Sequence, residues 1–444
     1  MDEIMRRFLF LFVAGILLLG GVVPAFAQAP SPGQTTQVAA SSSLDPAAAT
    51  QAWLDTVPAD KREKSDAYFE GGYWLILWNY LASVAFSLLL LWGGISAWLR
   101  DFAERRTRFR PLQIWIYAVG YLLLATILTF PLTLYTDYFR EHQYELATQN
   151  LPAWLGDQTK GLIIALILTP ALLVLLYTVF RRAPRTWWLW GTGLGAIFLV
   201  VAMLVSPIFI EPLFNTYKPL SDPKISDPIL VMAAANQIPV HQVFEVDASR
   251  QTNRVSANVA GMFGTTRIAL NDNLLKQCTL PEIRAVMAHE MGHYVLNHGL
   301  KLVLYFGLFM FVGFAPLNAV FDRCIARWGE RWGVRGIADP AGLPLLALIL
   351  ATYFFFLTPL QNSAVRVTER EADAFGLNTA READGFAKVA LKLGTYRKLN
   401  PGPWEEAIFF DHPSGRARIR MAMDWKAAHL PPGDAAGPLK VPSR

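Results

Sequence analysis

The sequence predicts an all-α protein that crosses a membrane several times and carries a small α+β element beside its membrane helices. Three observations support this fold class. Hydrophobic residues make up 53% of the 444 residues and charged residues only 17%, a composition typical of membrane proteins. Six apolar stretches are long enough to cross a bilayer core of ~30 Å at about 1.5 Å per residue. Between the fourth and fifth stretches, residues 211–298 read as a soluble segment.

The N-terminal 27 residues have the pattern of a secretory signal peptide. Arg6 and Arg7 precede an apolar run over 8–23, and Ala25-Phe26-Ala27 places small residues at the cleavage positions. An uncleaved first span is the alternative for residues 1–27. Residues 28–60 are predicted to be a flexible linker, because their first part is a low-complexity stretch that cannot bury a core.

The membrane helices fall into two groups. Residues 61–210 are predicted to form a membrane domain with four spans, near 73–98, 112–135, 161–180 and 186–210. Residues 299–361 are predicted to hold two further spans, near 300–320 and 343–361. The last helix should continue into residues 362–429, the C-terminal part of the predicted site, with shorter helices near 381–399 and 414–428. Residues 430–444 are Pro/Gly-rich and are predicted to be a loose tail.

The soluble segment is predicted to contain a helix over 225–237, short strands within 240–247 and 254–270, and a helix that carries an HExxH motif. The motif consists of His289, Glu290 and His293. Thr279 and Glu282 have the spacing of a capping box, with a proline just inside the helix start, so a helix is expected here.

The HExxH motif predicts a zinc site and a hydrolase. His289 and His293 are four residues apart on one helical face, so both imidazoles can bind the same Zn²⁺. Glu290 lies about 100° further round the helix, where it can hold water as a general base. Zinc lowers the pKa of such a water to roughly 7. A chance match on an ordinary helix is the alternative, but with 7 histidines in 444 residues such a match is rare.

Two histidines leave a catalytic zinc one protein ligand short. His298, five positions beyond His293, would lie about 140° round the same helix, and we assign it a structural or supporting role. Glu369 is the better candidate, because Asp373 follows one turn later on the same face and can orient a ligand histidine. A solvated, charged helix is the alternative interpretation of this acidic pair.

These motifs resemble those of the integral-membrane CAAX prenyl protease family, the gluzincin metalloendopeptidases of the CAAX prenyl protease 1 type. The resemblance rests mainly on His-Glu-Met-Gly-His at 289–293 and Glu-Arg-Glu-Ala-Asp at 369–373. Further matching segments are Glu211-Pro-Leu-Phe-Asn215, Ser256-Ala-Asn-Val-Ala-Gly261 before Arg267-Ile-Ala-Leu270, and His412-Pro413 with Arg418. Val365 stands where the family usually has serine, and the arginine that follows is kept.

The resemblance implies roles for residues that spacing alone leaves open. It implies that Glu369 is the third protein ligand of one Zn²⁺, and that Asp373 supports His289 and can donate a proton. It also implies that His412 and Arg418 approach the substrate and the developing oxyanion. Without the resemblance, these two residues read as a turn histidine and a surface arginine.

The resemblance further implies an edge strand that binds an extended substrate through backbone hydrogen bonds. Its residues are Asn258, Val259, Ala260 and Gly261. An ordinary edge strand without a substrate is the alternative.

The distribution of arginine predicts the orientation of the chain in the membrane. Arginines gather in loops 100–110, 181–185 and 322–335, whereas loop 137–160 is mainly acidic. By the positive-inside rule the arginine-rich loops are cytoplasmic, so the catalytic segment faces the extracytoplasmic side. A signal peptide without an organelle address predicts the bacterial inner membrane. Eukaryotic members of the family hold the catalytic domain on the cytosolic side, so the substrate can differ while the peptidase chemistry is shared.

Together these observations predict a zinc metalloendopeptidase whose membrane helices enclose an intramembrane chamber. It is predicted to cleave extended segments of membrane-associated or extracytoplasmic polypeptides. The alternative within this class is CAAX-type cleavage of prenylated C-termini. A transporter with an ion site is the alternative of another class, although the span cores are nearly uncharged and no internal repeat is present. The predicted partners are a polypeptide substrate and the lipid bilayer; no nucleic acid and no particular oligomeric state are predicted. Cys278 and Cys324 are expected to form no disulfide.

Overall fold

The computed structural model describes residues 44–261 and 265–429, and within them six helical segments are long and apolar enough to cross a membrane. The predicted helical class and the number of spans are therefore confirmed. The signal segment at 1–27 and the tail at 430–444 lie outside the described residues. The spans are Ala59–Trp92, Arg110–Gln143, Leu151–Arg182, Trp187–Leu213, His298–Trp332 and Pro340–Ala380.

Single helices form three of these spans, namely α3 (Ala59–Trp92), α7 (Leu151–Arg182) and α12 (His298–Trp332). The other three also contain short π-helical or 3₁₀-helical segments. They are α5 (Arg110–Leu134) with η1 (Tyr135–Phe139) and α6 (Arg140–Gln143), α8 (Trp187–Val205) with η2 (Ser206–Ile210) and η3 (Glu211–Leu213), and η5 (Pro340–Gly342) with α13 (Leu343–Ala380).

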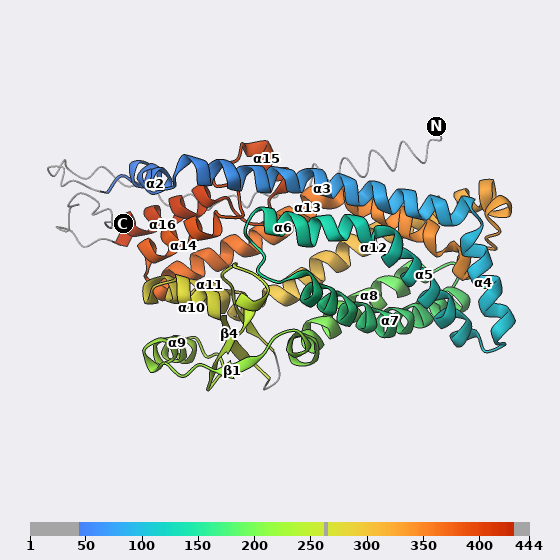
Figure 1. Ribbon diagram of the computed structural model, residues 1–444, viewed down its shortest axis with the longest axis horizontal. Coiled ribbons are helices and arrows are strands. Elements are labelled where there is room, and N and C mark those ends of the chain that lie inside the picture. Colours follow the sequence, from blue (N-terminus) through green and yellow to red (C-terminus); the bar gives the residue numbers. More distant parts are fainter. Residues whose placement is uncertain (1–43, 262–264, 430–444) are drawn as a thin grey trace, which may run out of the picture.

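The six spans form a closed ring whose helices run roughly along the long axis of the molecule (Figure 1). Each span packs against two neighbours, in the cyclic order α3, α13, α12, α8, α7, α5 and back to α3. A ring in which helices pack mainly on their neighbours encloses a central space. The predicted arrangement of helices around a chamber is therefore confirmed.

The first span ends earlier than the sequence predicted. The apolar pattern placed it over 73–98, but α3 ends at Trp92, and a separate helix, α4 (Ile95–Arg106), begins after Gly94. Gly94 has a φ of +67°, a left-handed conformation that glycine adopts without the steric cost of a Cβ. Hydrophobicity does not reveal this break, because both sides of it are apolar. Helix α4 lies at the end of the bundle, at the right of Figure 1.

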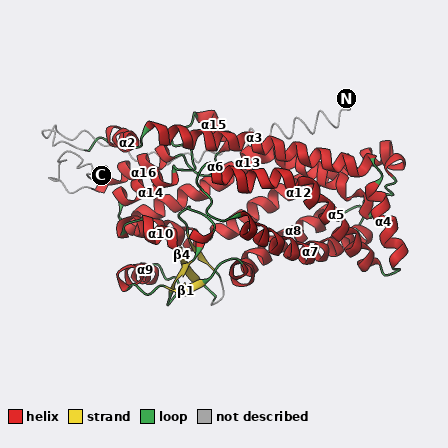
Figure 2. Cartoon of the chain, in the orientation of Figure 1, coloured by secondary structure: helices red, strands yellow, loops and turns green. Residues whose placement is uncertain are grey.

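A small four-stranded sheet lies beside the ring, at the end opposite α4 (Figure 2). Its strands are β1 (Tyr217–Pro219), β2 (Val243–Val246), β3 (Ala257–Ala260) and β4 (Arg267–Asn271), in the order β1-β2-β4-β3. Strands β2 and β4 are parallel, and the other two pairs are antiparallel. Helices α9 (Pro223–Ala235), α10 (Asp272–Gln277) and α11 (Leu280–Val295), with the turn η4 (Ala248–Arg250), complete this α+β element.

Part of the predicted linker is structured. Residues 28–60 were expected to be flexible, but α2 (Pro46–Asp55) is a helix, and α3 begins already at Ala59. The Asp45 side chain caps α2 by accepting a hydrogen bond from Ala47 N at 2.9 Å. Ala49 and Leu54 are buried in a cluster with α16. The alanine-rich composition that suggested a linker also forms helices well, and the partner surface lies more than 300 residues further along the chain.

The C-terminal region adds three helices. They are α14 (Ala383–Leu393), α15 (Pro403–Phe409) and α16 (Gly415–His429). Helix α14 packs against α11, and α15 packs against α13. Helices α14 and α16 were expected, whereas α15 was not. Helices α14 and α16 share a core with the end of α13, which includes Phe386, Ile419, Met423 and Leu377. This packing holds α16 against the end of α13, where the polar residues of the predicted site lie.

Candidate active site

The HExxH motif lies on α11, and the sequence determines where this helix starts. Glu282 Oε2 accepts hydrogen bonds from Thr279 N and Thr279 Oγ1, each at 2.6 Å, so the predicted capping box is present. Burial would raise the pKa of the Glu282 carboxyl, but the cap and the Lys392 ammonium 2.7 Å away lower it. Glu282 therefore stays ionised near the helix N-terminus, where a negative charge is stabilising.

Helices α11 and α13 cross closely at two glycines, one on each helix. A Cβ added to Gly292 would lie 3.2 Å from Ala372 Cα, and one added to Gly376 would lie 3.0 Å from His289 N. Both separations are shorter than ordinary van der Waals contacts, so the backbones can approach this closely only because both residues lack a Cβ. The crossing brings the acidic motif of α13 beside the histidines of α11.

His289, His293 and Glu369 direct three ligand atoms toward one point. The two Nε2 atoms are 3.1 Å apart, and the Glu369 oxygens lie 3.4 Å from Nε2 of His289 and 3.5 Å from Nε2 of His293. Ligands ~2.1 Å from a tetrahedral zinc ion are separated from one another by ~3.4 Å. The three side chains therefore have the spacing of a zinc ligand set. Within the described residues they are the one such cluster of His, Cys, Asp or Glu.

The electrostatics of this cluster also favour a cation. Burial would lower the pKa of His289, but its contacts with Asp373 and Glu369 raise it to about 9. Burial and the charge of His289 lower the pKa of His293 to about 4. The buried carboxylates thus stabilise positive charge at the point between the ligand atoms, and a divalent metal ion supplies that charge.

Glu290 lies on the wall of the same cavity as the two histidines. No hydrogen bond or ion pair within the described residues holds its carboxylate, and burial raises its pKa to about 7. A carboxylate that has no bonding partner and whose pKa is near neutral pH can take up a proton in one step and release it in the next. This is the property that the sequence assigned to the general base.

Asp373 is completely buried between one histidine and one arginine. Its Oδ1 atom lies 2.8 Å from Nδ1 of His289 and 2.5 Å from Nη2 of Arg418, which comes from α16. Burial would lower the pKa of Arg418, but the charge of Asp373 raises it. Asp373 therefore orients His289, and the buried arginine approaches the site mainly by holding Asp373.

His412 also belongs to the site, although it lies in the turn before α16. Its Nε2 atom is 3.3 Å from Glu369 Oε2, and its Nδ1 atom is 2.8 Å from Asp411 Oδ1. Burial would raise the pKa of Asp411, but its bond to His412 lowers it. The ionised aspartate fixes the ring so that Nε2 points into the cavity.

The predicted substrate residues lie next to the cavity but not in its wall. The cavity has a volume of about 280 Å³, and Val255, Ser256 and Ala257 line it at the start of β3. Asn258, Val259 and Ala260 continue along β3, which is the predicted edge strand, and Gly261 follows the strand with a φ of +100°. The strand thus leads away from the cavity, and its first residues are the ones closest to the metal ligands.

His298 does not lie on the helix of His293, as the sequence analysis assumed. Helix α11 ends at Val295, Asn297 has a φ of +56°, and α12 begins with His298 itself. This turn brings His298 Nδ1 to 3.0 Å from Nδ1 of His293. The 140° angle was wrong because it presupposed a continuous helix.

The ring of His298 connects the metal site to a charged pair. Its Nε2 atom lies 3.0 Å from Oε2 of Glu371, which in turn lies 2.6 Å from Nζ of Lys301. Glu371 and Lys301 were not predicted from the sequence to belong to the site, and neither were Tyr396 and Arg397 in the cavity wall. Glu371 lies two residues beyond Glu369, about 200° round the helix, so helical spacing gave no sign of its contact with His298.

The fold and the site together define an integral-membrane metallopeptidase. Residues 40–216 match the family model of the CAAX prenyl protease N-terminal region with five membrane helices. Residues 219–426 match the model of peptidase family M48. The chain belongs to this family of membrane metalloproteases, and membership implies that the site holds a metal ion.

Several curated proteins are similar to this chain over most of their length. The uncharacterized metalloprotease YhfN of Bacillus subtilis (strain 168) is 29% identical over 336 residues, covering 75% of this chain and 79% of that protein. CAAX prenyl protease 1 of Saccharomyces cerevisiae is 26% identical over 318 residues, covering 68% of this chain and 70% of that protein. These relatives are named as proteases, which decides against the transporter alternative.

A solved structure shares the fold. The crystal structure of S. mikatae Ste24p superimposes with a TM-score of 0.71 at 20% sequence identity, covering 85% of this chain and 94% of that chain. The likeness therefore extends over most of the fold.

Proposed function

We propose that His289, His293 and Glu369 bind one Zn²⁺ and that the site hydrolyses peptide bonds with Glu290 as general base. The observation that carries this proposal is the 3.1–3.5 Å spacing of the three ligand atoms, which fits a tetrahedral ion with one position left for water. Two imidazoles and one carboxylate favour zinc over Mg²⁺ or Ca²⁺, which take mainly oxygen ligands.

Each residue of the site then has a defined task. A zinc ion held by His289, His293 and Glu369 would act as a Lewis acid, which lowers the pKa of a bound water molecule and polarises a carbonyl. Glu290 accepts a proton from the attacking water and passes it to the leaving nitrogen. Asp373 holds His289 through Nδ1, which leaves Nε2 free for the metal. Arg418 neutralises Asp373 and keeps it in place.

His412 is the residue best placed to stabilise the oxyanion. Its Nε2 atom is on the cavity side, 3.3 Å from Glu369, and Asp411 holds the opposite nitrogen of the ring. A preoriented donor of this kind typically lowers the barrier by ~3–4 kcal/mol. The contact with Asp411 keeps the ring in this orientation.

The substrate we propose is an extended polypeptide segment that adds a strand beside β3. Strand β3 pairs only with β4 among the described strands, so its other edge is free for a peptide backbone. Residues 255–257 connect this edge to the cavity, which sets the scissile bond close to the ligand atoms. The residues 258–261 hold the more distant part of the peptide.

We place the protein in the bacterial inner membrane with its catalytic end outside the cytoplasm. The support is the gathering of arginines at the opposite end of the bundle, in loops 100–110, 181–185 and 322–335. Its substrates are then extracytoplasmic or membrane-associated polypeptides. CAAX-type cleavage is the second candidate, because several relatives are named CAAX prenyl protease 1.

Hydrolysis assays with purified full-length protein test the proposal. We expect Glu290→Gln to lose at least ~100-fold in kcat while retaining stoichiometric zinc, because a general base contributes roughly 10²–10⁴-fold. The control is Glu330→Gln, a matched change of an exposed glutamate at the far end of α12. Undiminished hydrolysis by the Glu290 variant, or by protein stripped of metal, would overturn the mechanism.

A comparison of substrates separates the two candidate functions. The assay uses an unfolded polypeptide, a farnesylated peptide ending in a CAAX sequence, and the same peptide without its farnesyl group. Cleavage of the unfolded polypeptide and equal rates on the two short peptides are expected. A strong preference for the farnesylated peptide would instead establish CAAX-type processing.

A further inference from the structure

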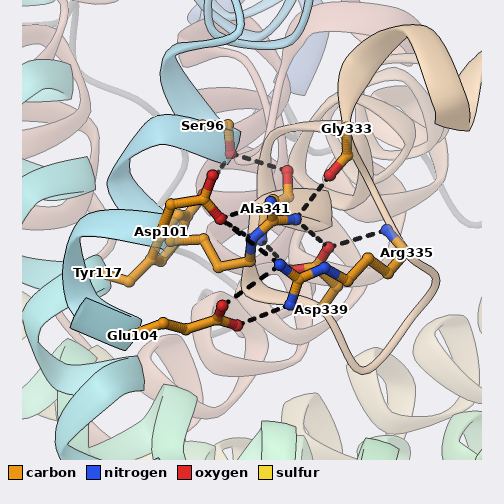
Figure 3. Close-up of polar contacts among 9 residues, drawn as sticks. Ser96, Asp101, Glu104, Tyr117, Gly333, Arg335, Asp339 and Ala341 are labelled. Carbon is orange, nitrogen blue, oxygen red and sulfur yellow. Dashed lines mark hydrogen bonds and ion pairs between the residues drawn. The ribbon is translucent and has the colours of Figure 1, made fainter. Parts of the chain in front are cut away.

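The end of the bundle opposite the metal site contains a polar cluster that the peptidase mechanism does not use. Figure 3 shows it where α4, the start of α5 and the loop from Gly333 to Ala341 meet. Helix α12 begins at His298, beside the metal ligands, and ends at Trp332. Its 35 residues separate the two ends by roughly 52 Å at 1.5 Å per residue. Any ligand bound here therefore lies far from His289, His293 and Glu369.

The acidic members of this cluster are fully engaged by two arginines. Arg100 Nη1 donates to Asp339 at 2.7 Å and to the Gly333 carbonyl at 2.6 Å, and the same guanidinium also binds Asp101. Arg335 binds Glu104 through both terminal nitrogens, at 2.8 and 3.3 Å. Asp339 additionally accepts a bond from the backbone N–H of Arg335 at 2.8 Å. These carboxylates have little capacity left for other cations.

A cavity of about 450 Å³ lies beside the cluster and contains two further arginines, Arg110 and Arg181. Arg110, at the start of α5, makes no hydrogen bond or ion pair within the described residues. Arg181, at the end of α7, donates only to a hydroxyl, Thr178 Oγ1 at 3.0 Å. Because the carboxylates Glu104 and Asp339 of the cavity wall are already paired, these two guanidinium groups present uncompensated positive charge to the cavity.

The chemistry of the cavity matches a phosphate ester. Guanidinium groups bind phosphate oxygens with paired, charge-assisted hydrogen bonds, and the volume lies within the range of ligand sites, about 300–1,000 Å³. Both free phosphate and a phospholipid headgroup offer this chemistry, so the surroundings of the cavity must decide between them.

The surroundings favour a lipid. Large aromatic side chains at this end of the bundle are exposed, among them Phe109 at 65%, Trp98 at 56% and Trp190 at 62%, as in the aromatic belts at membrane–water interfaces. Leu112 on α5 and Leu175 on α7 are also exposed, at 44% and 54%. The helices that carry the two unpaired arginines thus offer apolar surface to acyl chains directly beside the cavity.

We propose that Arg110 and Arg181 form a binding site for the phosphate of an anionic phospholipid, held between the ends of α4, α5 and α7. Basic cavities between membrane helices bind acidic headgroups in this way. Arg100 and Arg335 do not bind the ligand themselves; their ion pairs fix the wall of the cavity. The bound lipid joins two helices of the ring, α5 and α7, to α4 at the end far from the catalytic centre.

Native mass spectrometry of the purified full-length protein tests this site with phosphatidylglycerol as the anionic probe and phosphatidylcholine as the zwitterionic one. We expect one phosphatidylglycerol to be retained per chain in preference to phosphatidylcholine. Replacing both arginines in Arg110→Gln/Arg181→Gln should weaken binding roughly thirtyfold, which corresponds to about 1 kcal/mol for each arginine.

The matched control is Arg105→Gln/Arg182→Gln. It also removes two positive charges, one from α4 and one from α7, but neither residue lines the cavity. It should bind as the unmodified protein does. An equal loss in both double variants, or equal retention of the two lipids, contradicts a specific site. Binding of millimolar inorganic phosphate in the absence of lipid, with displacement of phosphatidylglycerol, contradicts the lipid assignment.

Two further measurements keep the outcome decisive if a variant is poorly folded. Zinc content and peptide hydrolysis report on the distant active site and should be unchanged in both double variants. Photo-crosslinking of unmodified protein with a photoactivatable phosphatidylglycerol should label peptides that contain residues 108–114 and 178–185. Labelling confined to other peptides contradicts the site.

Discussion

Asp373 illustrates how a single side chain links the metal site to the surrounding fold. Its carboxylate contacts His289 on one side and Arg418 on the other, at 2.8 and 2.5 Å, and the side chain is fully buried. One contact concerns the affinity for metal and the other the stability of the fold, because a buried charge without its partner is costly. These two effects can be separated experimentally.

We predict that Asp373→Asn weakens zinc binding by about 10–100-fold, the usual effect of losing an outer carboxylate. It should also lower the free energy of unfolding by about 3–5 kcal/mol, because Arg418 is left as an unpaired buried charge. Zinc competition titrations and thermal unfolding measure the two quantities. The double variant Asp373→Asn/Arg418→Met should regain stability but not zinc affinity; recovery of both would contradict this division of roles.

His298 is predicted to position His293. His298→Ala removes the ring that contacts His293 Nδ1 at 3.0 Å and should weaken zinc binding about tenfold, with kcat at saturating zinc changed little. His241→Ala serves as the control, since this histidine is exposed and distant from the ligands in the sequence. Zinc affinity that is unchanged in His298→Ala would show that the contact has no positioning role.

At the scale of elements, the close crossing of α11 and α13 determines the ligand geometry. Gly376→Ala would place a Cβ 3.0 Å from His289 N, so we predict a loss of roughly 1–3 kcal/mol in unfolding free energy. Zinc retention should fall with it, because the helices must separate. Gly307→Ala on α12, where a Cβ meets nothing within 4 Å, is the control and should leave zinc content unchanged. Full zinc content in Gly376→Ala would refute the argument.

The elements also show what can be predicted from a sequence. His289, Glu290 and His293 follow from local spacing on one helix, and the capping box at Thr279 specifies that helix. Glu369 lies 76 residues beyond His293, so spacing could not decide between a ligand and a solvated carboxylate. The contacts of His298 depend on the turn at Asn297, and the burial of α2 depends on α16. Neither long-range packing nor an isolated left-handed residue leaves a periodic pattern.

At the scale of the whole molecule, the arginine-rich end and the catalytic end must lie on opposite sides of the membrane. We predict that a reporter active only outside the cytoplasm is active when fused after about residue 240, within the soluble segment. A reporter active only in the cytoplasm should be active when fused near residue 330, at the end of α12. The reverse result would overturn the orientation and make cytosolic C-termini the leading substrates.

The continuity of α13 has a consequence for how the enzyme responds to its surroundings. Helix α13 has 38 residues. It begins at the end of the bundle that holds the Arg110 and Arg181 cavity, and it carries Glu369 and Asp373 toward its other end. Its tilt is set by packing against α3, α11 and α12, and a mismatch between the apolar length of the spans and the hydrocarbon thickness can change it. In thinner or thicker bilayers a change in tilt would move a metal ligand directly. We therefore expect turnover to vary with the acyl-chain length of the surrounding bilayer, a dependence that a soluble peptidase does not have.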